Sequence, residues 1–171
     1  MNVIVCVKQI PDPALPGELD ADNTLKRDGK LILDESDSYG VEMALQLVGA
    51  AGDGAVTLVS MAPNDEVSGL RTALAMGAEK AVLVSDSSLA GADALTTAKV
   101  LGGAVGKAGD FDLVIAGTES SDGYTGTVPE QLAEVLGLPS VTFAKTIAVD
   151  GGTVKVDRQT EAGYDEVTCS L

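Results

Sequence analysis

Residues 112–138, with the sequence DLVIAGTESSDGYTGTVPEQLAEVLGL, constrain the fold more than any other part of the chain. An apolar run at 113–116 predicts a buried strand, which ends in a loop of glycine, serine and threonine. The loop leads directly into a predicted amphipathic helix, whose single apolar face holds Val128, Leu132, Val135 and Leu136. Thr127 and Glu130 have the spacing of a capping box, and Gly137 predicts the end of the helix. A strand joined to a helix in this way is the repeating unit of an α/β fold.

The rest of the chain repeats this alternation. Apolar runs at 3–7, 55–59 and 80–84 predict further strands, and helical periodicity follows each of them, with helices expected to begin among residues 34–37, near 67 and near Asp93. Short connections between strands and helices imply right-handed crossovers, so we expect a doubly wound, mostly parallel sheet. After Pro139 the pattern changes to a strand at 141–149, a hairpin around 150–152, and a final strand beginning at 167. These predict antiparallel additions to a single domain that spans residues 1–171.

A loop between a buried strand and a helix leaves backbone N–H groups unpaired at the positive end of the helix, where phosphates bind. By the topological rule for α/β sheets, a ligand lies beyond the carboxyl ends of the strands. The candidate binding residues are therefore Cys6 after the first strand, Met61 after the second, and Gly117, Thr118, Ser120, Ser121, Asp122, Gly123, Thr125, Gly126 and Thr127 in the loop. The same loop is equally compatible with a solvated connection and an ordinary helix cap. Asp122 could accept from a ribose or an adenine amine, or only fix a turn. Lys8 could meet a phosphate or lie at the surface.

Composition excludes several functions. The chain has no histidine, which rules out Ser-His-Asp and histidine–zinc chemistry within it, and no catalytic or metal-ligating residue is assigned. A net charge of −15 disfavours nucleic acid and anionic membranes as partners. No apolar run has membrane-spanning length, and the N-terminus lacks the features of a signal peptide, so we expect a cytoplasmic protein without membrane insertion.

Four segments together resemble the beta subunit of electron transfer flavoproteins. They are VIVCVKQIPD, GVEMALQL, LRTALAMGAEKAVLV and DLVIAGTESSDGYTGTVPEQLAEVLGLPSVTFA, and the resemblance covers essentially the whole chain. It implies an adenine-nucleotide alpha-hydrolase-like fold and a heterodimer with an FAD-binding alpha subunit. Such a heterodimer carries electrons from acyl-CoA-type or other flavin dehydrogenases, so this chain would be a carrier subunit and not itself an enzyme.

The resemblance also implies that the beta subunit holds AMP or FAD. The family's nucleotide contacts would fall at Cys6, at Met61 and along Gly117 to Thr127, which is the site expected from the strand ends. The alternative function is a stand-alone adenine-nucleotide-binding module of the stress or sensing type, without a redox role.

Three departures from the family pattern are visible. Asp34-Glu35-Ser36 stands where the family has Asn-Pro-Phe, which predicts a lost amide contact or an acid that repels phosphate. The loop ends in Thr127-Val128-Pro129 in place of a Gln-Thr-Gly-Pro pattern. The family also continues past Leu171 with a further strand, a lysine-rich docking segment and an arm around the alpha subunit. We therefore expect this chain to be a nucleotide-binding core that lacks the C-terminal portion and cannot transfer electrons alone.

Overall fold

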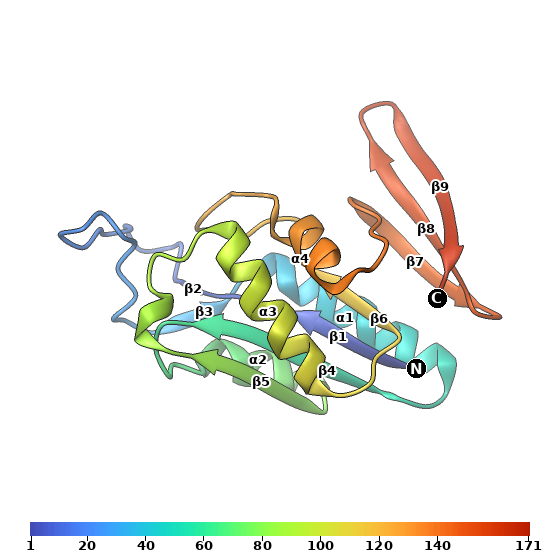
Figure 1. Ribbon diagram of the computed structural model, residues 1–171, viewed down its shortest axis with the longest axis horizontal. Coiled ribbons are helices and arrows are strands. Elements are labelled where there is room, and N and C mark those ends of the chain that lie inside the picture. Colours follow the sequence, from blue (N-terminus) through green and yellow to red (C-terminus); the bar gives the residue numbers. More distant parts are fainter.

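The computed structural model describes all residues from Met1 to Leu171. Its central sheet has four parallel strands in the spatial order β5-β4-β1-β6 (Figure 1). Their bounds are Asn2–Cys6 for β1, Ala55–Ala62 for β4, Lys80–Ser85 for β5 and Leu113–Ala116 for β6. Strand β1 lies inside the sheet, with Cys6 opposite Val59 of β4 on one side and Ala116 of β6 on the other. The parallel sheet predicted from the alternating pattern is confirmed.

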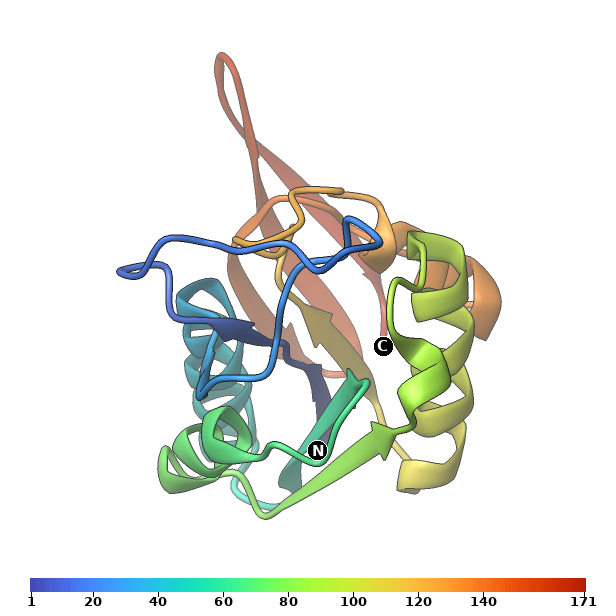
Figure 2. The same ribbon diagram turned by 90° about the vertical axis from the view of Figure 1, so that its left-hand side faces the viewer.

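Helices cover both faces of this sheet. Figure 2 shows α1 (Glu35–Ala51) and α2 (Ser68–Ala75) on one side, and α3 (Ala94–Ala108) with α4 (Val128–Leu136) on the other. The α1/α2 side buries Val3, Val5, Val41, Ala44, Leu70 and Ala73, and the α3 side buries Ile4, Val59, Ala98, Leu101, Val105 and Leu132. Alternate residues of β1 therefore enter different cores, as expected of a doubly wound sheet with a strand buried on both faces.

The connections fix where a ligand can bind. From β1 the chain passes through α1 to β4, whereas β6 is reached through α3 on the opposite face. The carboxyl ends of β1 and β6 therefore lie side by side at the point where the winding direction reverses. In open α/β sheets the binding crevice lies at such a point.

A short antiparallel ribbon, which was not predicted from the sequence, extends this edge of the fold. Strand β2 (Gln9–Pro11) pairs with β3 (Leu31–Leu33), and Gln9 lies opposite Leu33. Helix α2 packs directly on this ribbon at Gly69, where a Cβ atom would lie 2.8 Å from the Leu33 nitrogen. The glycine is required at this point because any side chain would collide with backbone.

The C-terminal residues form a separate three-stranded antiparallel sheet in the order β7-β8-β9. Its strands are β7 (Ala144–Asp150), β8 (Thr153–Thr160) and β9 (Gly163–Ser170), and Figure 1 shows it projecting from the body at the end that holds both termini. The predicted hairpin is confirmed, but the last strand begins at Gly163 and not at residue 167. Charged side chains on its exposed positions, such as Asp165 and Glu166, hide the alternation that marks a strand, although β9 pairs with β8 along its length.

Aspartate side chains cap α1 and α3. The Asp34 carboxylate accepts from the backbone N–H of Ser36 at the start of α1, and Asp93 accepts from that of Thr96 at the start of α3. The capping box expected at Thr127 and Glu130 is wrong, because the Thr127 side chain makes no capping bond and its backbone has φ −129° and ψ −6°. None of the helices is both long enough and apolar enough to cross a membrane.

Candidate functional site

A cavity of about 810 Å³ opens where the strands β1, β4 and β6 end. Its walls come from residues 6–9 after β1, from 61–64 after β4, and from the loop that follows β6. Residues 87–92, which include the short 3₁₀ helix η1 (Ser87–Leu89), and residues 23–28 complete it. The volume lies within the range of sites that enclose small molecules and cofactors, roughly 300–1,000 Å³.

Most of the predicted binding residues meet in this cavity. The residues that line it are Cys6, Met61, Gly117, Thr118, Ser120, Asp122, Gly123, Thr125 and Gly126. Ser121 and Thr127 are not part of its wall. Three segments far apart in the sequence therefore converge as expected from their positions at strand ends.

The N-terminus of α4 borders the cavity, although Pro129 in its first turn has no backbone N–H. Val128 and Pro129 lie in the cavity wall, and no side chain caps this end of the helix. By contrast, the N-terminus of α2 is closed by Gln9, whose Oε1 accepts from the backbone N–H groups of Gly69 and Leu70. The uncapped end of α4 carries the partial positive charge of the helix and suits a phosphate group.

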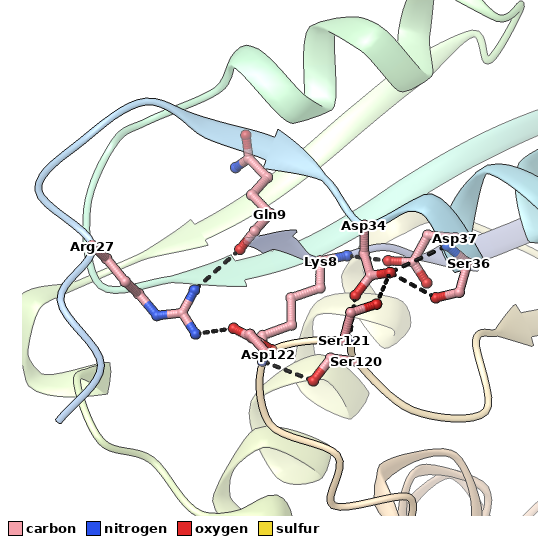
Figure 3. Close-up of polar contacts among 9 residues, drawn as sticks. All are labelled: Lys8, Gln9, Arg27, Asp34, Ser36, Asp37, Ser120, Ser121 and Asp122. Carbon is pink, nitrogen blue, oxygen red and sulfur yellow. Dashed lines mark hydrogen bonds and ion pairs between the residues drawn. The ribbon is translucent and has the colours of Figure 1, made fainter. Parts of the chain in front are cut away.

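Ser121 holds the loop to the start of α1 instead of facing the cavity. Its backbone N–H donates to Asp34 Oδ2 at 2.7 Å, and its hydroxyl donates to Asp34 Oδ1 at 2.8 Å (Figure 3). Burial acts to raise the pKa of Asp34, but the hydrogen bonds from Ser121 and Ser36 outweigh it and lower the pKa below its ordinary value. Asp34 does not line the cavity, so the acid at this position anchors the loop.

Asp37 is a buried carboxyl group at the floor of the site. Its Oδ2 accepts from the backbone N–H of Lys8 at 2.6 Å. Burial raises the pKa of Asp37 to about 7, because desolvation and the nearby Asp34 carboxylate outweigh the hydrogen bond from Lys8. A Cβ atom at Gly117 would lie 2.7 Å from Asp37 Oδ1, so only glycine allows the loop to pass this close to the carboxyl group.

Asp122 joins two cations at the edge of the cavity. Lys8 Nζ lies 2.6 Å from Asp122 Oδ1, and the Arg27 guanidinium pairs with Asp122 Oδ2 (Figure 3). Burial alone raises the pKa of Asp122, but Lys8 and Arg27 lower it further, so the net pKa lies below its ordinary value. The carboxylate accepts from these two side chains and not from a nearby backbone N–H, so the prediction that Asp122 only fixes a turn is wrong, whereas its contact with a ligand stays a prediction. Lys8 is not a free surface lysine, since its Nζ also donates to the Ser120 hydroxyl at 3.0 Å.

Sequence reasoning did not find Gln9 and Arg27. Gln9 Nε2 donates to the Glu66 carbonyl, and the Gln9 carbonyl accepts from Arg27 Nη1 at 3.2 Å. Gln9, the first residue of β2, therefore links the β2–β3 ribbon to α2 and to Arg27. Two features of the sequence could have pointed to these residues. Gln9 directly follows Lys8 near the end of a predicted strand, and Arg27 is one of only three arginines in the chain, the others being Arg71 and Arg158.

Cys6 lines the cavity, but its thiol is unreactive. Its side chain is buried among α3 contacts, and burial raises the pKa of its thiol to about 12. A thiol with this pKa stays protonated at neutral pH and is a poor nucleophile. Cys169 is also a free cysteine, and no group of side chains suited to a metal ion is present.

Comparison with known proteins shows the family. Residues 22–170 match the Electron transfer flavoprotein domain. The chain belongs to the electron transfer flavoprotein domain family. It is 40% identical over 168 residues to the electron transfer flavoprotein subunit beta of Mycobacterium leprae, which covers 95% of this chain and 63% of that protein. It is 39% identical to the subunit of the same name from Clostridium acetobutylicum, covering 98% of this chain and 64% of the relative.

A third relative of this electron transfer flavoprotein domain carries a different name. Protein FixA of Azorhizobium caulinodans is 38% identical over 179 residues, covering 100% of this chain and 63% of that protein. The chain thus spans somewhat less than two thirds of the length of these relatives. The matched domain contains the loop after β6 and the Arg27 segment, whereas the wall residues 6–9 precede it.

Proposed function

We propose that this chain acts as a beta-type subunit of an electron transfer flavoprotein and that its cavity binds the adenylate portion of AMP or FAD. The loop residues Gly117, Thr118, Ser120, Gly123, Thr125 and Gly126, together with Cys6 and Met61, form the binding surface. Asp122 sets the charge at its edge. Ser121 and Thr127 take part indirectly, Ser121 by anchoring the loop on Asp34 and Thr127 as the residue that precedes α4.

One observation carries this proposal: the uncapped N-terminus of α4 opens into a cavity at the carboxyl ends of β1 and β6. Backbone N–H groups at a helix start bind phosphate without a charged side chain. The glycines of the loop have no side chain and let the backbone approach a ligand closely. A Cβ at Gly123 would lie 3.2 Å from the Ser120 hydroxyl, 3.7 Å from the Lys8 amino group and 3.9 Å from the Thr125 hydroxyl. A ribose has hydroxyl partners in Thr118, Ser120 and Thr125.

The role in electron transfer follows from the family and from the names of the relatives. A beta subunit implies an alpha-type partner, and we place this chain in such a heterodimer, receiving electrons from flavin dehydrogenases and acting as a carrier subunit. If FAD is the nucleotide, its ring supplies the redox chemistry. The residues of this chain bind and orient the adenylate, and bound AMP stabilises the fold by mass action.

The binding half of the proposal is tested by titration calorimetry of the purified chain with AMP and FAD, using GMP and inorganic phosphate as comparison ligands. We expect saturable binding of AMP or FAD at one site and weaker binding of GMP. Equal binding of all four ligands indicates a general anion site and contradicts an adenylate site.

The partner half needs a separate experiment. The chain is coexpressed with an electron transfer flavoprotein alpha subunit and purified through a tag on this chain alone. A complex containing both chains supports the subunit role. A homodimer that binds AMP and ignores the alpha subunit supports the stand-alone nucleotide module instead.

A further inference from the structure

Residues 12–30, which we call the strap, connect β2 to β3 and form one wall of the cavity. Leu25, Lys26, Arg27 and Asp28 of the strap line it. Near the tip of the strap, Thr24 reaches the opposite wall, since a Cβ at Gly91 would lie 3.3 Å from Thr24 Cγ2. The strap therefore passes from the β2–β3 ribbon to the η1 side of the cavity.

The strap is bonded to the rest of the molecule through one residue. Its other hydrogen bonds and ion pairs are internal, such as the pairs of Lys26 with Glu18 and Asp28 and the bond from the Asp20 N–H to the Thr24 carbonyl. Arg27 alone bonds outward: its guanidinium reaches Asp122 and the Gln9 carbonyl, and its own carbonyl accepts from Asn64 Nδ2 at 3.1 Å. Leu15 and Leu19, by contrast, are exposed apolar side chains.

The far end of this connection lies on the candidate nucleotide loop. The Asp122 side chain is only 6% exposed, and the Arg27 side chain is 21% exposed. The pair joins segments 95 residues apart in the sequence. Removing the Arg27 guanidinium leaves Asp122 paired with Lys8 alone, whereas removing the Asp122 charge leaves both Arg27 and Lys8 without this partner, and either change breaks the contact between strap and loop.

We propose that the Arg27–Asp122 pair is a latch that holds the strap across the cavity and sets how fast a bound adenylate leaves. The inference rests on the proposed binding function. Arg27 acts here as a positioning residue: it closes the cavity by fixing the strap to the loop after β6. A ligand held under a closed segment leaves only when that segment opens, so weakening the latch raises the dissociation rate.

The test uses Arg27→Met, Asp122→Asn and the double variant, with Lys26→Met as the matched control. Lys26 also lines the cavity, but both of its ion pairs stay within the strap. The dissociation rate of a fluorescent AMP analogue is measured by displacement with excess AMP. Limited proteolysis of the ligand-free protein measures how readily residues 12–30 are cleaved.

We expect Arg27→Met and Asp122→Asn each to raise the dissociation rate on the order of tenfold. The double variant should be no faster than Asp122→Asn, because that single variant already removes the ion pair with Arg27. Both single variants should also speed cleavage within 12–30, and Lys26→Met should change neither quantity by more than about twofold.

Three results overturn the latch. One is wild-type dissociation and cleavage rates in both single variants. Another is an opposite effect, with weaker AMP binding in Arg27→Met and tighter binding in Asp122→Asn, which indicates that the cations contact the phosphate directly. The third is unchanged cleavage combined with loss of binding in Arg27→Met alone. If Asp122→Asn does not fold, the dissociation and cleavage rates of Arg27→Met are compared with those of Lys26→Met instead.

Failure of the proposed function has a different signature. In that case the wild-type protein binds no AMP or FAD, while the cleavage experiment still reports whether Arg27 and Asp122 hold the strap. The two inferences therefore succeed or fail by separate readouts.

Discussion

Ser121 donates two hydrogen bonds to the carboxylate of Asp34, one from its backbone N–H and one from its hydroxyl. The same carboxylate caps α1 by accepting from the backbone N–H of Ser36 at 3.2 Å. The loop after β6 is thereby fixed to the beginning of α1, which lies on the face of the sheet opposite to α4, the helix that follows the loop. The carboxylate that the sequence predicted would repel a phosphate holds the candidate phosphate-binding loop in position.

Replacing Asp34 should separate its two roles. Asp34→Ala removes the helix cap and the contacts with Ser121, and we expect the free energy of unfolding to fall by roughly 2–4 kcal/mol. Asp34→Ser keeps a good capping residue but is too short to reach Ser121, so it should recover about 1 kcal/mol of that loss. Urea unfolding measures both. Equal stabilities for the two variants contradict the capping role.

Asp37 should make stability depend on pH near neutrality. Its pKa is raised from an ordinary value of 3.8 to about 7, so the folded protein binds a proton that the unfolded chain has released. The stabilising contribution of the protonated carboxyl is complete below about pH 4 and is lost as the pH rises through 7, at about 1.4 kcal/mol per pKa unit of the shift.

Asp37→Asn should remove this dependence, because the amide stays neutral and can still accept from the Lys8 N–H. We expect the variant to match the wild type near pH 4, to become progressively more stable than it between pH 4 and 7, and to keep that difference at pH 8. Asp34 and Asp122 do not affect this difference in stability between wild type and variant. Their pKa values are lowered, so their contributions to the free energy of unfolding are lost only as the pH falls below the ordinary carboxyl range. Parallel stability curves for wild type and variant across this interval are incompatible with a raised Asp37 pKa.

Two adjacent glycines of α3 should respond oppositely to alanine. A Cβ at Gly102 would lie 2.6 Å from Val135 Cγ1 of α4, whereas a Cβ at Gly103 has no neighbour within 4 Å. Gly103→Ala should stabilise the protein by about 0.5–1 kcal/mol through helix propensity. Gly102→Ala should destabilise it by about 1–3 kcal/mol through overpacking.

The close packing of α3 on α4 is the reason for this difference, and thermal unfolding of the two variants measures it. Val135→Ala added to Gly102→Ala should restore part of the loss, because it removes the colliding methyl groups. If both glycine variants gain stability, the two helices do not approach as closely as the structure shows.

Gly126 should be essential for the adenylate and much less so for the fold. Its φ is +64°, and a branched side chain there would enter the region of Glu119, whose Oε2 lies 3.3 Å from the position of a Cβ. We expect Gly126→Val to raise the dissociation constant for AMP at least about tenfold, since a β-branched residue disfavours this backbone conformation. Gly137→Val is the control, because Gly137 has a similar φ of +68° at the far end of α4 and no neighbour within 4 Å. An equal change in affinity in both variants points to a general loss of stability and not to the site.

Much of the fold could be predicted because the spacing of apolar residues along the sequence indicates which side chains are buried. The strands β1, β4 and β6 are apolar runs inside a parallel sheet, and the helices carry one apolar stripe each, so both signals are local. The C-terminal sheet was predicted less accurately, since it is largely exposed and charged side chains interrupt its pattern. The β2–β3 ribbon was missed because strands of three residues carry too little periodicity to recognise.

The residues of the candidate site also fall into a predictable and an unpredictable group. Residues at strand ends, such as Cys6, Met61 and Gly117, could be brought together from topology alone. The contacts of Arg27 with Asp122 and of Asp34 with Ser121 could not, because they join segments whose separation in space depends on the path of irregular loops. Sequence spacing contains no information on such pairs.

Adenylate binding in the cavity is tested most directly by a crystal structure of the protein grown with saturating AMP. We expect electron density for the nucleotide in the cavity beyond β1 and β6, with its phosphate at the N-terminus of α4 and its ribose against Thr118 to Gly126. Density for AMP at a remote surface, or a cavity that stays empty at a concentration that saturates binding in solution, contradicts an adenylate site in this cavity.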